Sequence, residues 1–280
     1  MKKIFKILTA AALTAAITIA AAGFAACGGK DTGDPYTITV GASITPHAEI
    51  LKDVVKPELE KYGYTLKVVE FTDYVQPNTA LEQGDLDANY FQHNLYLNDF
   101  NQTRGTHLTA VAQVHYEPFA VYRGSYTTGG LADIPNGSQV GVPNDGTNEA
   151  RALLLLQKEG LITLRDGVTA SNITKLDVVS NPKNLNIVEL EAAQLTEHLS
   201  SLAIAVINGN YAIEGGLDLA DALATEEATD DAVQQYINVI AVKTGNENKP
   251  KIKALKTAIL SDGVREYIAE HYDGAVVAAF

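Results

Sequence analysis

The residues with the greatest capacity for chemistry gather between Asp87 and Tyr96, in the stretch Asp-Ala-Asn-Tyr-Phe-Gln-His-Asn-Leu-Tyr. It combines three aromatic rings, one imidazole and several amides within ten residues. Aromatic walls with a few convergent polar groups are typical of a small-molecule pocket. Buried polar groups also need partners, and a helix start with buried tyrosines is the alternative interpretation. This segment alone does not decide between the two.

A second polar segment, Asn144 to Arg151, predicts the beginning of a helix. Asp145, Thr147 and Asn148 are residue types that cap helices, and the free N–H groups of a helix N-terminus attract a carboxylate or phosphate. Arg151 is expected in the first turn or so, where a cation is electrostatically unfavourable. Its guanidinium therefore either binds the anionic group of a ligand or pairs with a surface acid.

Two asparagines stand at apolar strands. Asn208 ends the run Ala203–Ile207, and Asn238 lies inside Ile237–Ile240. A buried amide must find partners, and an α-ammonium or a carboxylate could be one. A turn or a helix cap explains Asn208 nearly as well, but it explains Asn238 less easily because Asn238 lies within the strand.

Motifs for metal, nucleotide or hydrolytic chemistry are not found. The six histidines could in principle bind zinc, but none forms an i,i+4 pair; they are His47, His93, His107, His115, His198 and His271. The sequence contains no P-loop, no G-x-G-x-x-G and no G-x-S-x-G. We therefore predict no metal, no cofactor and no enzymatic activity.

Alternating strands and helices must position these groups. Strands are expected at 36–43, 65–71, 108–113, 119–123, 138–143, 174–179, 187–190, 202–207 and 236–242. Helices are expected from 45 to about 63 and at 77–83, 149–159 and 192–199, and 250–272 is expected to form one or two helices. This order predicts two α/β lobes with largely parallel sheets and a ligand cleft at the carboxyl ends of their strands.

The N-terminus predicts export. Residues 1–26 combine three lysines, an apolar run and small residues before Cys27, as in a secretory signal. Cys27 is the single cysteine and resembles the lipobox cysteine of bacterial lipoproteins, although Phe24 stands where leucine is usual. That resemblance implies a lipid anchor on Cys27 and a flexible tether over 27–35. A secreted protein cut near Ala26 is the alternative.

Charge and cysteine content exclude several classes. Without the three lysines of the signal, 18 basic residues face 34 acidic ones, a net charge of −16. Such an anion is a poor partner for nucleic acid. The absence of further cysteines excludes disulfides, thiolate zinc sites and cysteine catalysis in the mature chain.

Ordered motifs along the mature chain resemble the methionine-binding lipoproteins of bacterial methionine ABC importers, the NlpA/MetQ family. The matching segments are 38–43, Thr45-Pro-His-Ala-Glu-Ile-Leu51, Phe71-Thr-Asp-Tyr-Val-Gln-Pro-Asn78, 84–93, Val142-Pro-Asn-Asp-Gly-Thr-Asn-Glu-Ala-Arg-Ala-Leu153, 181–184, 206–212 and 274–280. The resemblance implies a two-lobed periplasmic-binding-protein fold, type II-like, that closes on its ligand. We place lobe 1 at 36–122 plus 238–280 and lobe 2 at 123–237.

The resemblance also implies a binding site. Tyr74, Phe91, His93 and Tyr96 would line the slot for the ligand side chain, Arg151 would hold the carboxylate, and Asn208 and Asn238 would contact the α-amino and carboxylate groups. The ligand would be methionine, delivered to a membrane permease and its ATPase on the extracytoplasmic side. L-methionine, D-methionine and a methionine dipeptide stay open, because an apolar slot separates similar side chains by only about 1–3 kcal/mol.

Two other functions stay open from the sequence. A metal-capturing lipoprotein could use His47, His93, His107 or His115 with a carboxylate. An extracellular enzyme could also be built on the same scaffold, because a fold does not fix a function.

Overall fold

The computed structural model describes residues 34–170, 173–229 and 234–280. The predicted signal peptide, Cys27 and the tether as far as Gly33 lie outside these residues. Within the described ranges, no helix combines the length and the apolar character needed to cross a membrane.

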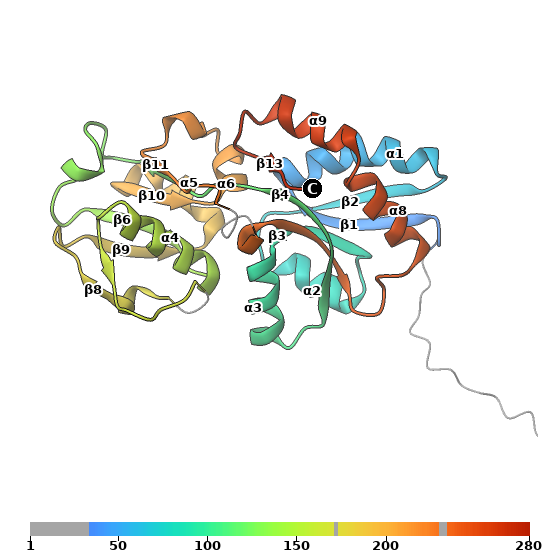
Figure 1. Cartoon of the computed structure of the whole chain (residues 1–280), viewed down its shortest axis with the longest axis horizontal. Helices are drawn as coiled ribbons and strands as arrows, with labels where there is room; N and C mark the ends of the chain where they lie inside the picture. Colours follow the sequence, from blue (N-terminus) through green and yellow to red (C-terminus); the bar gives the residue numbers. More distant parts are fainter. Residues whose placement is uncertain (1–33, 171–172, 230–233) are drawn as a thin grey trace, which may run out of the picture. The chain divides into compact units, whose positions relative to one another are not determined.

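The first of two large sheets has six strands in the order β13-β4-β12-β3-β1-β2 (Figure 1). Their bounds are β1 Thr37–Ser43, β2 Thr65–Phe71, β3 Ala88–His93, β4 Leu108–Tyr116, β12 Asn238–Lys243 and β13 Val277–Ala278. Strand β1 pairs in parallel with β2 and β3. Strand β12 is inserted antiparallel between β3 and β4, and β13 is antiparallel to β4.

The second sheet has five strands in the order β11-β5-β10-β6-β9. Their bounds are β5 Ala120–Arg123, β6 Gln139–Pro143, β9 Asn186–Leu190, β10 Ile204–Ile207 and β11 Ala224–Thr225. Strands β9, β6 and β10 are parallel, whereas β5 is antiparallel to β10. The prediction of largely parallel sheets was therefore only partly right. The exceptions include the strands that follow a crossing between the sheets. When the chain passes from the first sheet to the second, it forms the antiparallel strand β5, and when it returns to the first sheet, it forms the antiparallel strand β12.

Helices cover both faces of the first sheet because its strands alternate apolar residues between the faces. The helices are α1 Lys56–Lys61, α2 Gln76–Gln83, α3 Asn94–Arg104, α8 Pro250–Ile259 and α9 Asp262–His271, with π-helical turns at Ile44–Ala48 and Leu51–Val55. In β12, Ile240 and Val242 pack with α8 and α9, whereas Val239 and Ala241 pack with α2 and α3. The segment 250–272, predicted to form one or two helices, forms the two helices α8 and α9.

The second sheet is covered in the same way by α4 Gly146–Lys158 on one face and by α5 Leu195–His198 and α6 Gly209–Glu214 on the other. Val206 packs toward α4, and Ala205 and Ile207 pack toward α5 and α6. The predicted boundary between lobe 1 and lobe 2, after residue 122, falls inside β5, which pairs in the second sheet. The chain crosses between the sheets over residues 117–119.

Two local predictions were wrong. The polar stretch at 88–93 is not a loop or a helix start but the strand β3, whose six residues are all buried. Its amides bond inside the protein, because Asn89 Nδ2 donates to Asn78 Oδ1 over 2.8 Å and Gln92 Nε2 donates to the same oxygen over 2.8 Å. Thr174, predicted to begin a strand, instead caps a 3-10 turn before the short strand β8 Val178–Ser180, which pairs with β7 Thr163–Leu164.

Candidate functional site

A small cavity is lined by residues from the elements around both sheets. The lining residues are Tyr74, Phe91, Gln92, His93, Tyr96, Glu117, Asn148, Arg151, Asn208, Gly209, Asn210 and Asn238. All seven residues that the sequence nominated for ligand contact are among them. Glu117, Asn148 and Asn210 were not nominated.

One wall of the cavity is aromatic. The Tyr74 ring lies 5.8 Å from Phe91 and 5.8 Å from Tyr96, measured between ring centroids. Tyr211 approaches Tyr74 to 5.0 Å from the second sheet. The hydroxyl of Tyr96 donates to the Tyr74 backbone oxygen over 3.0 Å, and that of Tyr74 donates to Asn210 Oδ1. These bonds fix the rings, so the wall is preformed and apolar.

A wider groove adjoins this wall and shares Tyr74 and Tyr96 with the cavity. Five carboxylate residues line the groove, and no lysine or arginine is among its lining residues; the acids are Asp73, Asp145, Glu191, Glu197 and Glu214. The approach to the aromatic end is therefore negatively charged, which disfavours anionic ligands.

Arg151 also lines the cavity and is only 4% exposed. It is the sixth residue of α4, hence in the second turn and not the first, and Asp145 caps that helix by accepting from Asn148 N. The guanidinium Nε donates to both carboxylate oxygens of Glu226 over 3.1 Å, and Nη2 donates to the Glu117 backbone oxygen over 2.9 Å. The sequence left open whether Arg151 binds a ligand anion or pairs with a surface acid. In the structure it pairs with an acid, Glu226, but the side chain of this acid is largely buried, with 16% exposed. Among the described residues, these contacts leave Nη1 without a hydrogen-bond partner.

The surroundings of Arg151 keep its charge. The Tyr236 ring centroid lies 4.1 Å from the guanidinium carbon and that of Phe119 lies 4.6 Å from it, both within cation–π range. Burial lowers the pKa of Arg151, but Glu226, together with Tyr116 and Tyr236, raises the pKa by more than burial lowers it. The cavity thus contains a permanent buried cation.

Glu117 supplies the opposite charge and was missed from the sequence. Its side chain is buried, with Oε1 accepting from His115 Nε2 over 2.7 Å and Oε2 accepting from the Asn210 backbone N–H over 2.8 Å. Burial raises the pKa of Glu117, but the hydrogen bonds and the nearby histidines lower it by more, so the carboxylate is ionised. The histidines His47 and His115 lie within ion-pair distance of it in the described part of the chain. No lysine or arginine balances this charge there.

Two buried amide atoms at the cavity lack a hydrogen-bond partner among the described residues: the acceptor Asn208 Oδ1 and the donor Asn210 Nδ2. Asn208 stands at the N-cap of α6, yet its side chain does not cap that helix. Its Nδ2 donates instead to Asn148 Oδ1 over 3.1 Å. Buried polar atoms are nearly always paired in folded proteins, so this acceptor and this donor indicate a polar ligand.

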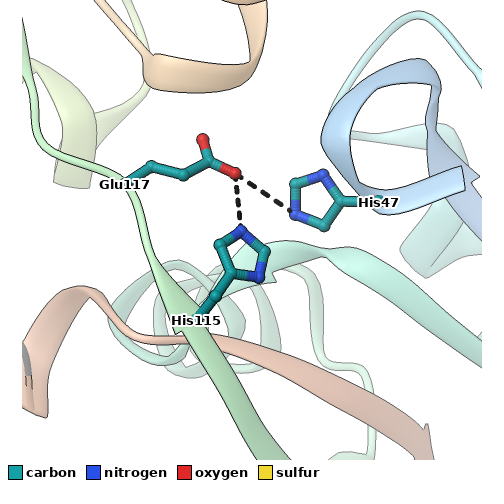
Figure 2. Close-up of side chains that lie close together, drawn as sticks. All are labelled: His47, His115 and Glu117. Carbon is teal, nitrogen blue, oxygen red and sulfur yellow. Dashed lines mark hydrogen bonds and ion pairs between the residues drawn. The ribbon is translucent and has the colours of Figure 1, made fainter. Parts of the chain in front are cut away.

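The four histidines considered for metal binding lie in three different environments. His47 and His115 point toward Glu117 (Figure 2). His93 lies apart from them and bonds Asn148 Oδ1 over 3.0 Å. His107 is at the surface, where its side chain is 76% exposed, and lies near Glu82. Asn238 bonds His47 Nε2 over 3.0 Å, so this asparagine connects the cavity to the histidine cluster.

His93 is held neutral. Its Nδ1 accepts from the Tyr96 backbone N–H over 3.0 Å, so the proton resides on Nε2, which donates to Asn148. Burial, followed by the charge of Arg151, lowers the pKa of His93 to about 3. A neutral imidazole therefore bridges the two sheets.

This burial predicts a pH-dependent stability. The unfolded chain binds a proton at His93 near pH 6.5, whereas the folded protein resists it down to about pH 3, so the free energy of unfolding falls as the pH falls below about 6.5. His47, whose pKa burial lowers to about 4, contributes in the same direction. We expect His93→Gln to reduce the slope between pH 6 and pH 5 by about 1 kcal/mol per pH unit. Urea unfolding in EDTA at several pH values measures this slope for the wild-type protein and for His93→Gln. Identical slopes in the two proteins would contradict a buried neutral His93.

The chain matches a known protein family and is similar to several proteins in sequence and in structure. The family described as NlpA lipoprotein matches residues 38–280. The D-methionine-binding lipoprotein MetQ of Salmonella typhi is 43% identical over 277 residues, covering 98% of each chain. A nutrient-binding protein from Burkholderia cenocepacia, solved bound to methionine, is 43% identical with a TM-score of 0.82, covering 87% of this chain and 100% of that one. The substrate-binding protein of a methionine transporter from Streptococcus pneumoniae is 37% identical with a TM-score of 0.81, covering 87% and 96%. The predicted two-lobed substrate-binding fold is confirmed by these structures.

Proposed function

Because the chain belongs to the NlpA lipoprotein family, we propose that it is the substrate-binding protein of an ABC importer and that it captures free methionine between its lobes. The observation that carries the proposal is one cavity with a guanidinium, an aromatic wall and a buried carboxylate that no lysine or arginine of the described residues pairs with. A free amino acid with an apolar side chain has the matching ammonium, carboxylate and tail.

The polar end of the cavity orients the ligand. We assign the α-ammonium to Glu117 and the unpaired acceptor Asn208 Oδ1, because both need a donor. We assign the carboxylate to Arg151 Nη1 and the unpaired donor Asn210 Nδ2. His93 and Asn238 hold the surrounding network, through Asn148 and His47 respectively. Every charge of the zwitterion then has a partner, as burial requires.

The aromatic wall accepts the side chain. Tyr74, Phe91 and Tyr96 suit a polarizable thioether, for which a sulfur–aromatic contact contributes about 0.3–1.5 kcal/mol. The protein in this proposal is a binding protein and not an enzyme, and it requires no cofactor. It delivers methionine to a membrane permease and its cytoplasmic ATPase.

Calorimetry with L-methionine and D-methionine tests this function directly. The protein is first unfolded and refolded to remove any bound amino acid. We expect stoichiometric binding of one or both stereoisomers and a rise in melting temperature, because a ligand that binds only the folded state stabilises it. No heat and no thermal shift at millimolar methionine would contradict the proposal.

The lipid anchor is a separate part of the proposal. We propose that Cys27 is diacylated and holds the protein on the extracytoplasmic side of the cell membrane. Cys27→Ser is expected to move the protein from the membrane fraction to the soluble extracytoplasmic fraction without changing methionine affinity. Fractionation followed by mass spectrometry of the N-terminal peptide measures this. A Cys27→Ser protein that stays in the membrane fraction would contradict the anchor and leave the binding proposal intact.

A further inference from the structure

We propose that His47, His115 and Glu117 form a binding site for one divalent transition-metal ion, of which zinc is the representative probe, beneath the amino-acid cavity. One ligand atom from each residue lies within 4.8 Å of the other two (Figure 2). Two imidazoles and a carboxylate are a donor set that suits zinc and its first-row neighbours. His47 and His115 are fully buried and Glu117 is 6% exposed.

The spacing of the donor atoms is close to that of a tetrahedral site. Glu117 Oε1 lies 2.7 Å from His115 Nε2 and 3.6 Å from His47 Nε2. Ligand bonds of about 2.0–2.2 Å in a tetrahedron place donor atoms about 3.3 Å apart. The two distances lie on either side of that value, so small side-chain rotations would open the site.

Both imidazoles are oriented from behind by hydroxyl groups. His47 Nδ1 lies 2.7 Å from Ser43 Oγ, and His115 Nδ1 lies 2.5 Å from the Tyr90 hydroxyl. When each Nδ1 carries the proton and donates to its hydroxyl oxygen, both Nε2 lone pairs face Glu117. Outer hydrogen bonds of this kind fix the ring orientation of metal-bound histidines.

The structure also offers a fourth donor. Asn238 Oδ1 lies 3.0 Å from His47 Nε2, on the same side as Glu117. Glu117 and Asn238 both line the cavity, so the proposed metal site adjoins the cavity. A carboxylate ligand from Glu117 offsets part of the charge of the ion, as a buried cation requires.

The test is titration of the mature protein, freed of metal with EDTA and of amino acid by refolding, with zinc alone in competition with a fluorescent chelator. We expect one ion per chain and at least a 100-fold weaker affinity in His47→Gln and in His115→Gln. Ser43→Ala is expected to weaken binding by about 10-fold or more, because it removes only an outer hydrogen bond. His107→Gln, at an exposed histidine near Glu82, is the matched control and should leave the affinity unchanged.

Spectroscopy keeps the proposal testable if a buried variant does not fold. X-ray absorption of the zinc-loaded wild-type protein should show two imidazoles and an oxygen ligand in the first shell. A first shell of oxygen atoms alone, or equal zinc affinity in wild type and His47→Gln, would overturn the proposal. In that case the three residues form only a hydrogen-bonded network. Zinc titration involves no methionine, so its failure would leave the proposed transport function untouched.

Discussion

Replacing Arg151 and Glu226 together, as Arg151→Met with Glu226→Gln, is expected to leave the protein folded while weakening methionine binding by roughly 2–5 kcal/mol. Arg151 and Glu226 neutralise each other in the interior, through contacts of Nε to both carboxylate oxygens. Removing both charges leaves no buried ion without a partner, which is often nearly neutral for stability. The ligand carboxylate, however, loses the guanidinium Nη1.

The single variant separates the two effects. Arg151→Met alone leaves the Glu226 carboxylate, whose side chain is 16% exposed, without its cation. We expect this to lower the free energy of unfolding by about 3–5 kcal/mol. Urea unfolding measures stability and calorimetry measures affinity for each variant. A folded double variant with wild-type affinity would remove Arg151 from the ligand site.

Glu117→Gln is expected to have the second large effect, a loss of methionine affinity of roughly 2–5 kcal/mol. The buried carboxylate of Glu117 has no lysine or arginine beside it in the described residues, so a ligand ammonium would be its permanent cationic partner. Glutamine has nearly the same shape. It also keeps a bond to His115 if that ring moves its proton to Nδ1, toward the Tyr90 hydroxyl. We therefore expect the fold to be retained.

A ligand without the amino group provides the matched control. Wild-type protein should bind 4-methylsulfanylbutanoate far more weakly than methionine, whereas Glu117→Gln should discriminate little between the two. This double comparison isolates the interaction between carboxylate and ammonium from any general damage to the cavity. Equal discrimination by wild type and variant would show that the amino group is held elsewhere.

Much of the cavity could be predicted because its residues are of unusual type for their positions. The aromatic rings and the imidazole of Phe91, His93 and Tyr96 exceed what an isolated core segment would need, and Asn238 interrupts an apolar run. Their side chains line one cavity in the structure. Glu117 had no such signal, because it is one of 34 acidic residues and its importance comes from partners elsewhere in the chain.

The remaining differences arise from long-range pairing. Strand β3 was missed because its buried amides did not suggest a strand. They are paired with Asn78 of α2, and this partner cannot be recognised from the local sequence. The antiparallel course of β5 and β12 follows from the two crossings between sheets and not from local propensity. His47 and His115 are far apart in sequence, so their approach to Glu117 could not be read from spacing.

The most direct test of the binding account is a crystal structure of the protein with methionine. We predict that its carboxylate contacts Arg151 Nη1, its ammonium contacts Glu117 and Asn208 Oδ1, and its thioether lies among Tyr74, Phe91 and Tyr96. Methionine bound in the opposite orientation, or outside this cavity, would contradict the account.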